Sequence, residues 1–171
     1  MHLYRRLLVS ALAVLVLSVP ATAGAAQQTY NDTISGHEYF ATTTDGKFAG
    51  TASGALPGYW NTDVRHTPLC VSCTPTATIT GGSFELATTV NGSPTLVTGD
   101  FTGGGVQVTN VGADCTNQTF TVDGVLGSVG PWYRGNGSGS FFVTLTHYRR
   151  RFFGSCITYA ASVAGTLSLT F

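Results

Sequence analysis

A basic and aromatic segment near the C-terminal end is the part of the sequence best suited to binding chemistry. The run His147-Tyr148-Arg149-Arg150-Arg151-Phe152-Phe153 contains three adjacent arginines. Guanidinium groups bind carboxylate, sulfate or phosphate groups through paired hydrogen bonds, and aromatic neighbours add stacking. The same composition is typical of a solvated hairpin tip whose arginines provide solubility. We predict ligand-binding candidates at His147, Tyr148, Arg149, Arg150 and Arg151, with the solvated tip as the alternative.

The histidines do not form a metal-binding motif. His37, His66 and His147 lie far apart and show neither i, i+2 nor i, i+4 spacing. If His147 continues the inward face of its strand, it lies at the mouth of a barrel, where an imidazole can act as a general base or a ligand donor. A histidine at a strand end is more often structural, so we predict neither a metal site nor a catalytic residue.

Two tryptophans, Trp60 and Trp132, are further ligand-binding candidates. They lie in Tyr59-Trp60 and Pro131-Trp132-Tyr133-Arg134. An exposed tryptophan of a secreted β-protein can stack on a sugar ring, whereas a buried one packs in the core. The sequence favours packing in the core or at a barrel end.

The cysteine pattern predicts disulfides. Cys70, Cys73, Cys115 and Cys156 are an even set, and a zinc site would need a second close pair. Three pairings are possible. We favour Cys115–Cys156, because both residues precede strand patterns, together with a local Cys70–Cys73 loop. That loop has prolines on both sides, so it is either a stapled strand connection or a stiff binding or inhibitory loop.

Carboxylates and catalytic motifs give no sign of an enzyme. The sequence has no Gly-x-Ser-x-Gly elbow, phosphate-binding loop or zinc-binding histidine pair, and no cofactor is expected. Glycosidase chemistry needs two carboxylates close in space, which a linear sequence does not reveal. The eight acidic residues are scattered: Asp32, Glu38, Asp45, Asp63, Glu85, Asp100, Asp114 and Asp123.

The elements that would position these residues are β-strands. Apolar residues repeat with period two rather than 3.6, and Gly or Asn pairs interrupt the pattern. The clearest strands are Ser140–Tyr148 and the C-terminal Ile157–Phe171, with Arg149–Gly154 as their connection and Gly165 as a bend or bulge. The other predicted strands are His37–Thr43, Lys47–Ala55, Tyr59–Arg65, Thr76–Thr89, Thr95–Phe101, Val106–Val111 and Thr116–Gly127.

These strands predict an all-β fold. Tight turns such as Asp45-Gly46 and Asn91-Gly92 join neighbouring strands in antiparallel pairs. Long strands favour a single antiparallel β-barrel of about eight strands, because closure removes the sheet edges. A two-sheet β-sandwich is the second choice.

An export signal precedes this domain. Arg5 and Arg6 are followed by an apolar run, Leu7–Val19, of 13 residues, then by Pro20 and small residues. This run fits a signal peptide and is too short to span a bilayer. We predict a signal peptide over residues 1–26, cleaved at 23–26, and a secreted β domain over 27–171 with no integral membrane segment.

The net charge limits the classes of partner that the domain is expected to bind. Removal of the leader leaves six basic and eight acidic residues, a net charge of −2. Such a charge gives no electrostatic reason to bind nucleic acid or anionic lipid. We therefore predict a secreted, extracellular, non-enzymatic barrel with a binding or structural role, its partner a small molecule, glycan or protein. The alternatives are a small barrel-type enzyme using His147 and nearby arginines, and a disulfide-looped inhibitor or adhesin.

Overall fold

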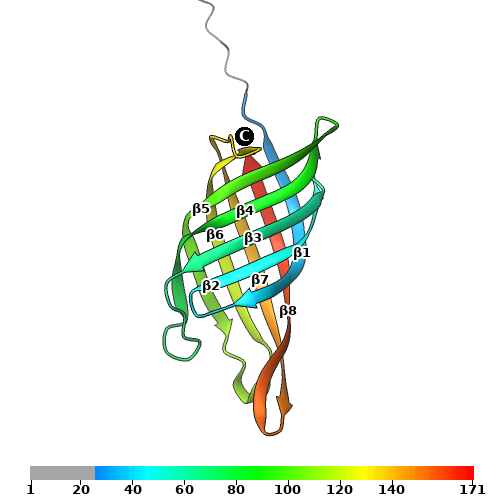
Figure 1. Cartoon of the computed structure of the whole chain (residues 1–171). Helices are drawn as coiled ribbons and strands as arrows, with labels where there is room; N and C mark the ends of the chain where they lie inside the picture. Colours follow the sequence, from blue (N-terminus) through cyan, green and yellow to red (C-terminus); the bar gives the residue numbers. More distant parts are fainter. Residues whose placement is uncertain (1–25) are drawn as a thin grey trace, which may run out of the picture.

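The computed structural model describes residues 26–171 and consists almost entirely of β-structure (Figure 1). The predicted leader lies outside the described residues, apart from Ala26. Within the described part of the chain, no helix is long and apolar enough to cross a membrane. The elements are β1 (Thr29–Ala41), β2 (Asp45–Gly54), β3 (Gly58–His66), β4 (Thr76–Val90), β5 (Ser93–Asn110), the short 3-10 turn η1 (Ala113–Cys115), β6 (Gln118–Pro131), β7 (Gly137–Phe152) and β8 (Ser155–Thr170).

The eight strands form one closed antiparallel barrel in chain order. Each strand pairs with the next, and β1 pairs with β8 from Thr29↔Thr170 to Gly36↔Val163. This closure confirms the predicted barrel in place of the sandwich. It also satisfies the backbone groups that an open sheet would leave at its edges.

The middle of the barrel is filled by side chains. Phe141 of β7 lies at the centre of an aromatic group, with ring centroids 5.8 Å from Trp60, 6.4 Å from Phe84 and 5.8 Å from Phe101. Phe84 and Phe141 are fully buried. Period-two alternation of β7 explains this position, since Phe141, Val143 and Leu145 point inward. The barrel is therefore a packed core at this level and not a continuous channel.

Glycines were expected to end one strand, and they bend it instead. The sequence predicts separate strands Thr95–Phe101 and Val106–Val111, but β5 runs through both. Its pairing with β6 shifts register between Phe101 and Gly103, which marks a bulge. A Cβ at Gly104 (φ 117°) would lie 2.0 Å from the carbonyl oxygen of Asp123. Glycine here allows a close approach of two strands within a long ladder.

Two further strand details differ from expectation. The first strand begins at Thr29, eight residues before the predicted start at His37. The pairing of Gly165 is regular with both Ile34 and Val143, so there is no bulge at this glycine. A Cβ at Gly165 would lie 2.0 Å from the Phe142 carbonyl oxygen. Its role is therefore a tight approach between β7 and β8.

The barrel has two different ends. The closed end carries the β2–β3, β4–β5 and β6–β7 connections and the C-terminus (Figure 1). The open end carries the β1–β2, β3–β4, β5–β6 and β7–β8 connections. At the open end β7 and β8 extend beyond the barrel as a long hairpin, seen in orange at the bottom of Figure 1.

This projecting part, Tyr148–Ala161, is called the tip hairpin below. The pairing of β7 with β6 stops at His147↔Gln118, and that of β8 with β1 stops at Val163↔Gly36. The two strands still pair with each other as far as Phe152↔Ser155. The predicted connection Arg149–Gly154 is thus mostly strand, and the turn itself is Phe153-Gly154. Both turn residues have positive φ, 47° and 81°, as a tight primed hairpin turn requires.

Candidate functional site

A cavity of about 250 Å³ lies inside the open end of the barrel. Its wall is mostly apolar, and its polar side chains come from β1, the β1–β2 turn, β2, β3, β6 and β7. The lining residues are Glu38, Ala41, Thr42, Thr43, Asp45, Gly46, Phe48, Val64, His66, Leu69, Val71, Val106, Gln118, Phe120, Val122, Leu145 and His147. Several of these are inward residues of the strands, so the cavity continues the core toward the open end.

A carboxylate–imidazole pair lies in this apolar wall. The Nε2 atom of His147 is 2.6 Å from Oε2 of Glu38. The two side chains are only 17% and 8% exposed. A short contact shielded from water is stronger than the same contact at a surface, since the local dielectric constant is lower. The pair supplies hydrogen-bonding capacity to an otherwise apolar cavity.

Strand geometry explains how two residues 109 positions apart meet. His147 continues the inward face of β7 and lies against the Phe120 ring, with ring centroids 4.9 Å apart. Glu38 follows Asp32 and Ile34 on the inward face of β1. The β1–β2 register shifts between Glu38 and Phe40, directly after this residue. The inward alternation of two strands therefore brings the acid and the base together.

The β3–β4 connection covers part of the cavity. Its cysteines, Cys70 and Cys73, form a disulfide, and its side chains Leu69 and Val71 line the cavity. The Leu69 N–H donates to the Thr43 carbonyl over 2.9 Å, which ties the connection to the β1–β2 turn. Because Leu69 and Val71 pack inward, this arrangement favours a stapled cover over a freely exposed inhibitory loop.

The β1–β2 turn forms a polar rim at the same cavity. Thr44 and Thr42 donate hydroxyl hydrogen bonds to Asp45 Oδ2 over 2.7 Å and 3.1 Å. The Thr44 hydrogen bond is the main reason why the pKa of Asp45 lies below its ordinary value. These contacts fix the turn and keep a negative charge at the rim.

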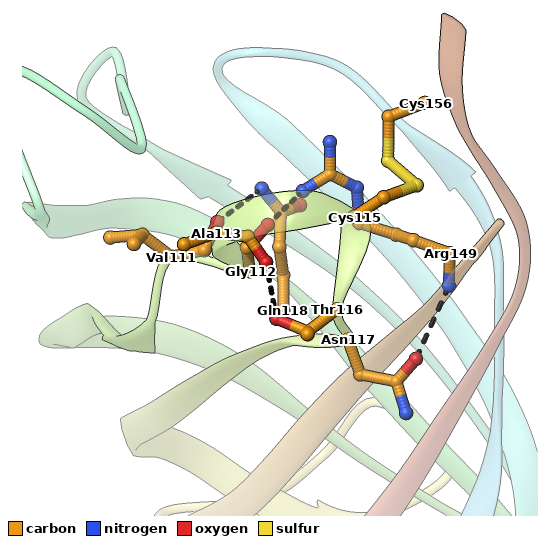
Figure 2. Close-up of a disulfide and its surroundings, with 9 residues drawn as sticks. All are labelled: Val111, Gly112, Ala113, Cys115, Thr116, Asn117, Gln118, Arg149 and Cys156. Carbon is orange, nitrogen blue, oxygen red and sulfur yellow. Dashed lines mark hydrogen bonds between the residues drawn. A yellow bond between two sulfur atoms is a disulfide. The ribbon is translucent and has the colours of Figure 1, made fainter. Parts of the chain in front are cut away.

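The residues of the tip hairpin, which begins directly after His147, lie outside the cavity. The Tyr148 hydroxyl is 3.1 Å from the Ser162 hydroxyl. Arg149 Nη1 donates to the Gly112 carbonyl over 2.9 Å, and its backbone N–H donates to Asn117 Oδ1, as Figure 2 shows. Arg150 lies over the Tyr159 ring, 5.2 Å from its centroid, and Arg151 is exposed. Of the five candidate residues in this segment, His147 lines the cavity, whereas the other four lie on the hairpin.

The two tryptophans are separated from this site. Trp60 is 2% exposed, and its Nε1–H donates to the Thr51 carbonyl over 3.1 Å. Trp132 is exposed in the β6–β7 connection at the closed end. The seven candidate residues therefore occupy the cavity, the tip hairpin, the core and the closed end.

The favoured cysteine pairing is the one in the structure. Cys115 and Cys156 are bonded, as are Cys70 and Cys73. The first bond joins the β5–β6 connection to β8 of the tip hairpin (Figure 2). Over residues 26–171, no group of three or more His, Cys, Asp or Glu side chains is arranged to hold a metal ion.

Sequence reasoning did not find Glu38, Leu69 or Val71 as site residues. In the linear sequence Glu38 is one of eight scattered carboxylates, and the predicted first strand begins only at His37. A strand beginning at Thr29 would have placed Glu38 on the same face as Asp32 and Ile34, which was the available signal. Leu69 and Val71 lie in a connection, where no periodic pattern predicts orientation.

The site and fold define a class of architecture: an eight-stranded antiparallel barrel with a filled middle and an apolar cavity at one end. Comparison with models of known families, with curated proteins and with solved structures gives no match for this chain.

Proposed function

We propose that this protein is a secreted, non-enzymatic binding protein that holds a small, mainly apolar molecule in the cavity at the open end. The observation that carries the proposal is a cavity with an apolar wall and one polar pair largely shielded from water, Glu38 and His147. Ligand sites are typically apolar, with a few placed polar groups that fix orientation. At about 250 Å³ the cavity is suited to a compact ligand.

The polar pair narrows the ligand class. An entirely apolar ligand would gain nothing from facing Glu38 and His147, whereas a ligand with a hydroxyl, amine or carboxyl group could replace or share their hydrogen bond. Both side chains are largely shielded from water, so an unmatched polar group in the ligand is costly. We therefore propose a ligand with a hydrocarbon body and one hydrogen-bonding group.

Secretion is part of this proposal. The predicted signal peptide and two disulfides support it, because disulfides persist in oxidising compartments. A binding role fits the absence of catalytic motifs in the sequence.

A titration with a neutral fluorescent probe, N-phenylnaphthylamine, tests the site. Val71→Phe places a larger side chain at the half-buried edge of the cavity and should reduce probe binding at least tenfold. Val111→Phe makes the same change at an exposed position outside the cavity and serves as the matched control. Equal probe binding by both variants, with unchanged circular dichroism, would reject the cavity as the site.

A second test concerns the β3–β4 connection, which covers part of the cavity. The Cys70→Ser, Cys73→Ser double variant loosens the β3–β4 connection without altering a cavity-lining side chain. If Leu69 and Val71 must be held in place, probe dissociation should become faster than in the parent protein. An unchanged dissociation rate would show that the disulfide serves stability alone.

An enzyme is the second candidate, favoured by the Glu38–His147 geometry. A carboxylate that orients an imidazole is a common arrangement for a general base. The arginines expected to assist His147 do not line the cavity, which is why binding is preferred. A bound ligand that mass spectrometry recovers unchanged supports binding. Chemical conversion that His147→Asn abolishes would establish the enzyme.

A further inference from the structure

The apex of the tip hairpin carries two exposed phenylalanines. Phe153 is 94% exposed and Phe152 is 51% exposed. Their rings pack against each other with centroids 4.4 Å apart. Burial of an aromatic ring is strongly favourable, so two adjacent apolar rings at the far end of a projecting hairpin are costly in water. This exposure needs an explanation that the cavity does not provide.

Cationic groups lie directly behind these rings. Arg150 and Arg151 form no ion pair with any acidic group of residues 26–171, and Arg150 is stacked on Tyr159. Arg149 is bound to the Gly112 carbonyl and holds the hairpin to the β5–β6 connection. Two guanidinium groups beside the apex are thus available to bind anions.

The hairpin is held as a defined shape. The β7–β8 ladder continues to Phe152↔Ser155, and the Cys115–Cys156 disulfide ties β8 to η1. Figure 2 shows this bond beside the Arg149 contacts to Gly112 and Asn117. A surface ordered before binding loses less conformational entropy on association than a flexible one.

We infer that the tip hairpin docks this protein on an anionic lipid surface. Phe152 and Phe153 enter the interfacial region, and Arg150 and Arg151 bind lipid phosphates through charge-assisted hydrogen bonds. Tyr159 is exposed on β8, farther from the apex than the two phenylalanines. In a docked protein it would lie at the level of the lipid headgroups, which tyrosine side chains prefer. Charge complementarity supports this partner, and the projecting apolar apex favours a fluid bilayer over a polar glycan.

The net charge of −2 over residues 27–171 does not oppose this docking. Charges farther apart than about 10 Å are largely screened at moderate salt, so the local arginines dominate at the apex. Half of the six basic residues after the leader lie in this one segment. A net charge describes the average over the whole surface, whereas the arginines are concentrated at the apex.

The docking would bring the open end toward the lipid, where the cavity could exchange an apolar ligand. The inference stands on the hairpin alone and does not depend on the proposed ligand-binding function. Its test uses vesicles without any cavity ligand, so the two proposals can fail separately.

Vesicle sedimentation tests the docking, with vesicles of phosphatidylcholine alone and of equimolar phosphatidylcholine and phosphatidylglycerol. The chain used begins at Ala26, so it contains every strand of the closed barrel. We expect binding to the anionic vesicles that weakens with added salt. Phe152→Ser with Phe153→Ser, and separately Arg150→Gln with Arg151→Gln, should each weaken binding by about tenfold or more.

Matched controls come from the closed end. Tyr59→Ser removes an exposed aromatic ring, and Arg134→Gln removes an exposed guanidinium, both far from the apex. Both should bind anionic vesicles as the parent protein does. No vesicle binding, or equal loss in the tip and control variants, would overturn the inference.

A Phe153→Trp variant in a Trp132→Phe background reports insertion directly. The fluorescence maximum of the new tryptophan should shift to shorter wavelength when anionic vesicles are added. Addition of buffer without vesicles should leave it unchanged. Retention on a sulfated polysaccharide column without any vesicle-induced shift would instead indicate an anionic glycan partner and overturn the lipid assignment.

Discussion

The two ends of the barrel are built from the same eight strands but are packed differently. At the closed end Leu56, from the β2–β3 connection, is 1% exposed and belongs to the core. Its backbone N–H donates to Asp32 Oδ1 over 2.8 Å, and the Tyr30 and Phe171 rings stack at 4.9 Å. At the open end the connections surround a cavity instead. One end is thus completed by packing, and the other retains a cavity of about 250 Å³.

The difference in packing between the two ends shows that strand alternation specifies which side chains face inward but not whether they fill the interior. Alternation decides which residues face inward, and it does so equally along β7 for Phe141 and Leu145. Whether the interior is full depends on the summed volume of inward side chains from all eight strands at one level. Phe141 meets three aromatic rings, whereas Leu145 faces a cavity. Packing density, not strand order, separates the two ends.

The largest expected effect tests this contrast within β7. Phe141→Ala should lower the free energy of unfolding by about 4 kcal/mol, because it opens a hole among rings that cannot close around it. Leu145→Ala, four residues toward the open end, should cost only about 2 kcal/mol, since it enlarges an existing cavity. Guanidinium unfolding measures both values. Equal losses would mean that the open end is packed as tightly as the middle in solution.

Sequence patterns favoured the barrel over the sandwich and the observed cysteine pairs over the two other pairings, and the alternation of one strand put His147 on the face of Phe141 and Leu145. Period-two alternation placed His147 on the inward face of its strand, and the cysteines were favoured in the observed pairs. Glu38 and the cavity were not predictable in this way. Their meeting depends on barrel closure and on register between strands distant in sequence, which a linear pattern does not contain.

The glycine-rich segment of β5 is a second case in which the linear sequence does not determine the structure. Gly103-Gly104-Gly105 was expected to separate two strands, since consecutive glycines usually mark a turn. In the barrel, Gly104 permits contact with the Asp123 backbone, and β5 continues. A glycine's role depends on what approaches it, which is known only once the neighbouring strand is placed.

An intermediate effect is expected from the buried acid of the closed end. Asp32 is 4% exposed and holds the β2–β3 connection through the Leu56 N–H. Asp32→Ala leaves that donor without its partner and should cost about 1–3 kcal/mol of unfolding free energy. Asp32→Asn keeps an acceptor oxygen and should cost less. A loss as large in the Asn variant would show that the negative charge matters more than the hydrogen bond.

The smallest expected effect concerns Asp45 at the open end. It is a change of stability with pH that the closed end should not share. Hydrogen bonding from Thr44 holds the pKa of Asp45 below its ordinary value of 3.8, so folding favours the ionised form. Its stabilisation is therefore present above pH 3.8 and is lost as pH falls through the lower, folded-state pKa. Asp45→Asn should lower the melting temperature slightly at neutral pH and make no difference in strong acid.

Thr44→Ala is the matched variant for this pH effect, because it removes the main cause of the lowered pKa while keeping the carboxylate. It should weaken the pH dependence that Asp45→Asn removes. Amide hydrogen exchange gives the spatial readout, since acid should loosen the β1–β2 turn at the rim of the cavity before the β2–β3 connection. The reverse order would contradict the division between an open end fixed by exposed polar contacts and a closed end fixed by burial. The exposed contacts are the ones that a change of solution can weaken without unfolding the barrel, so the open end is where this fold can respond to its surroundings.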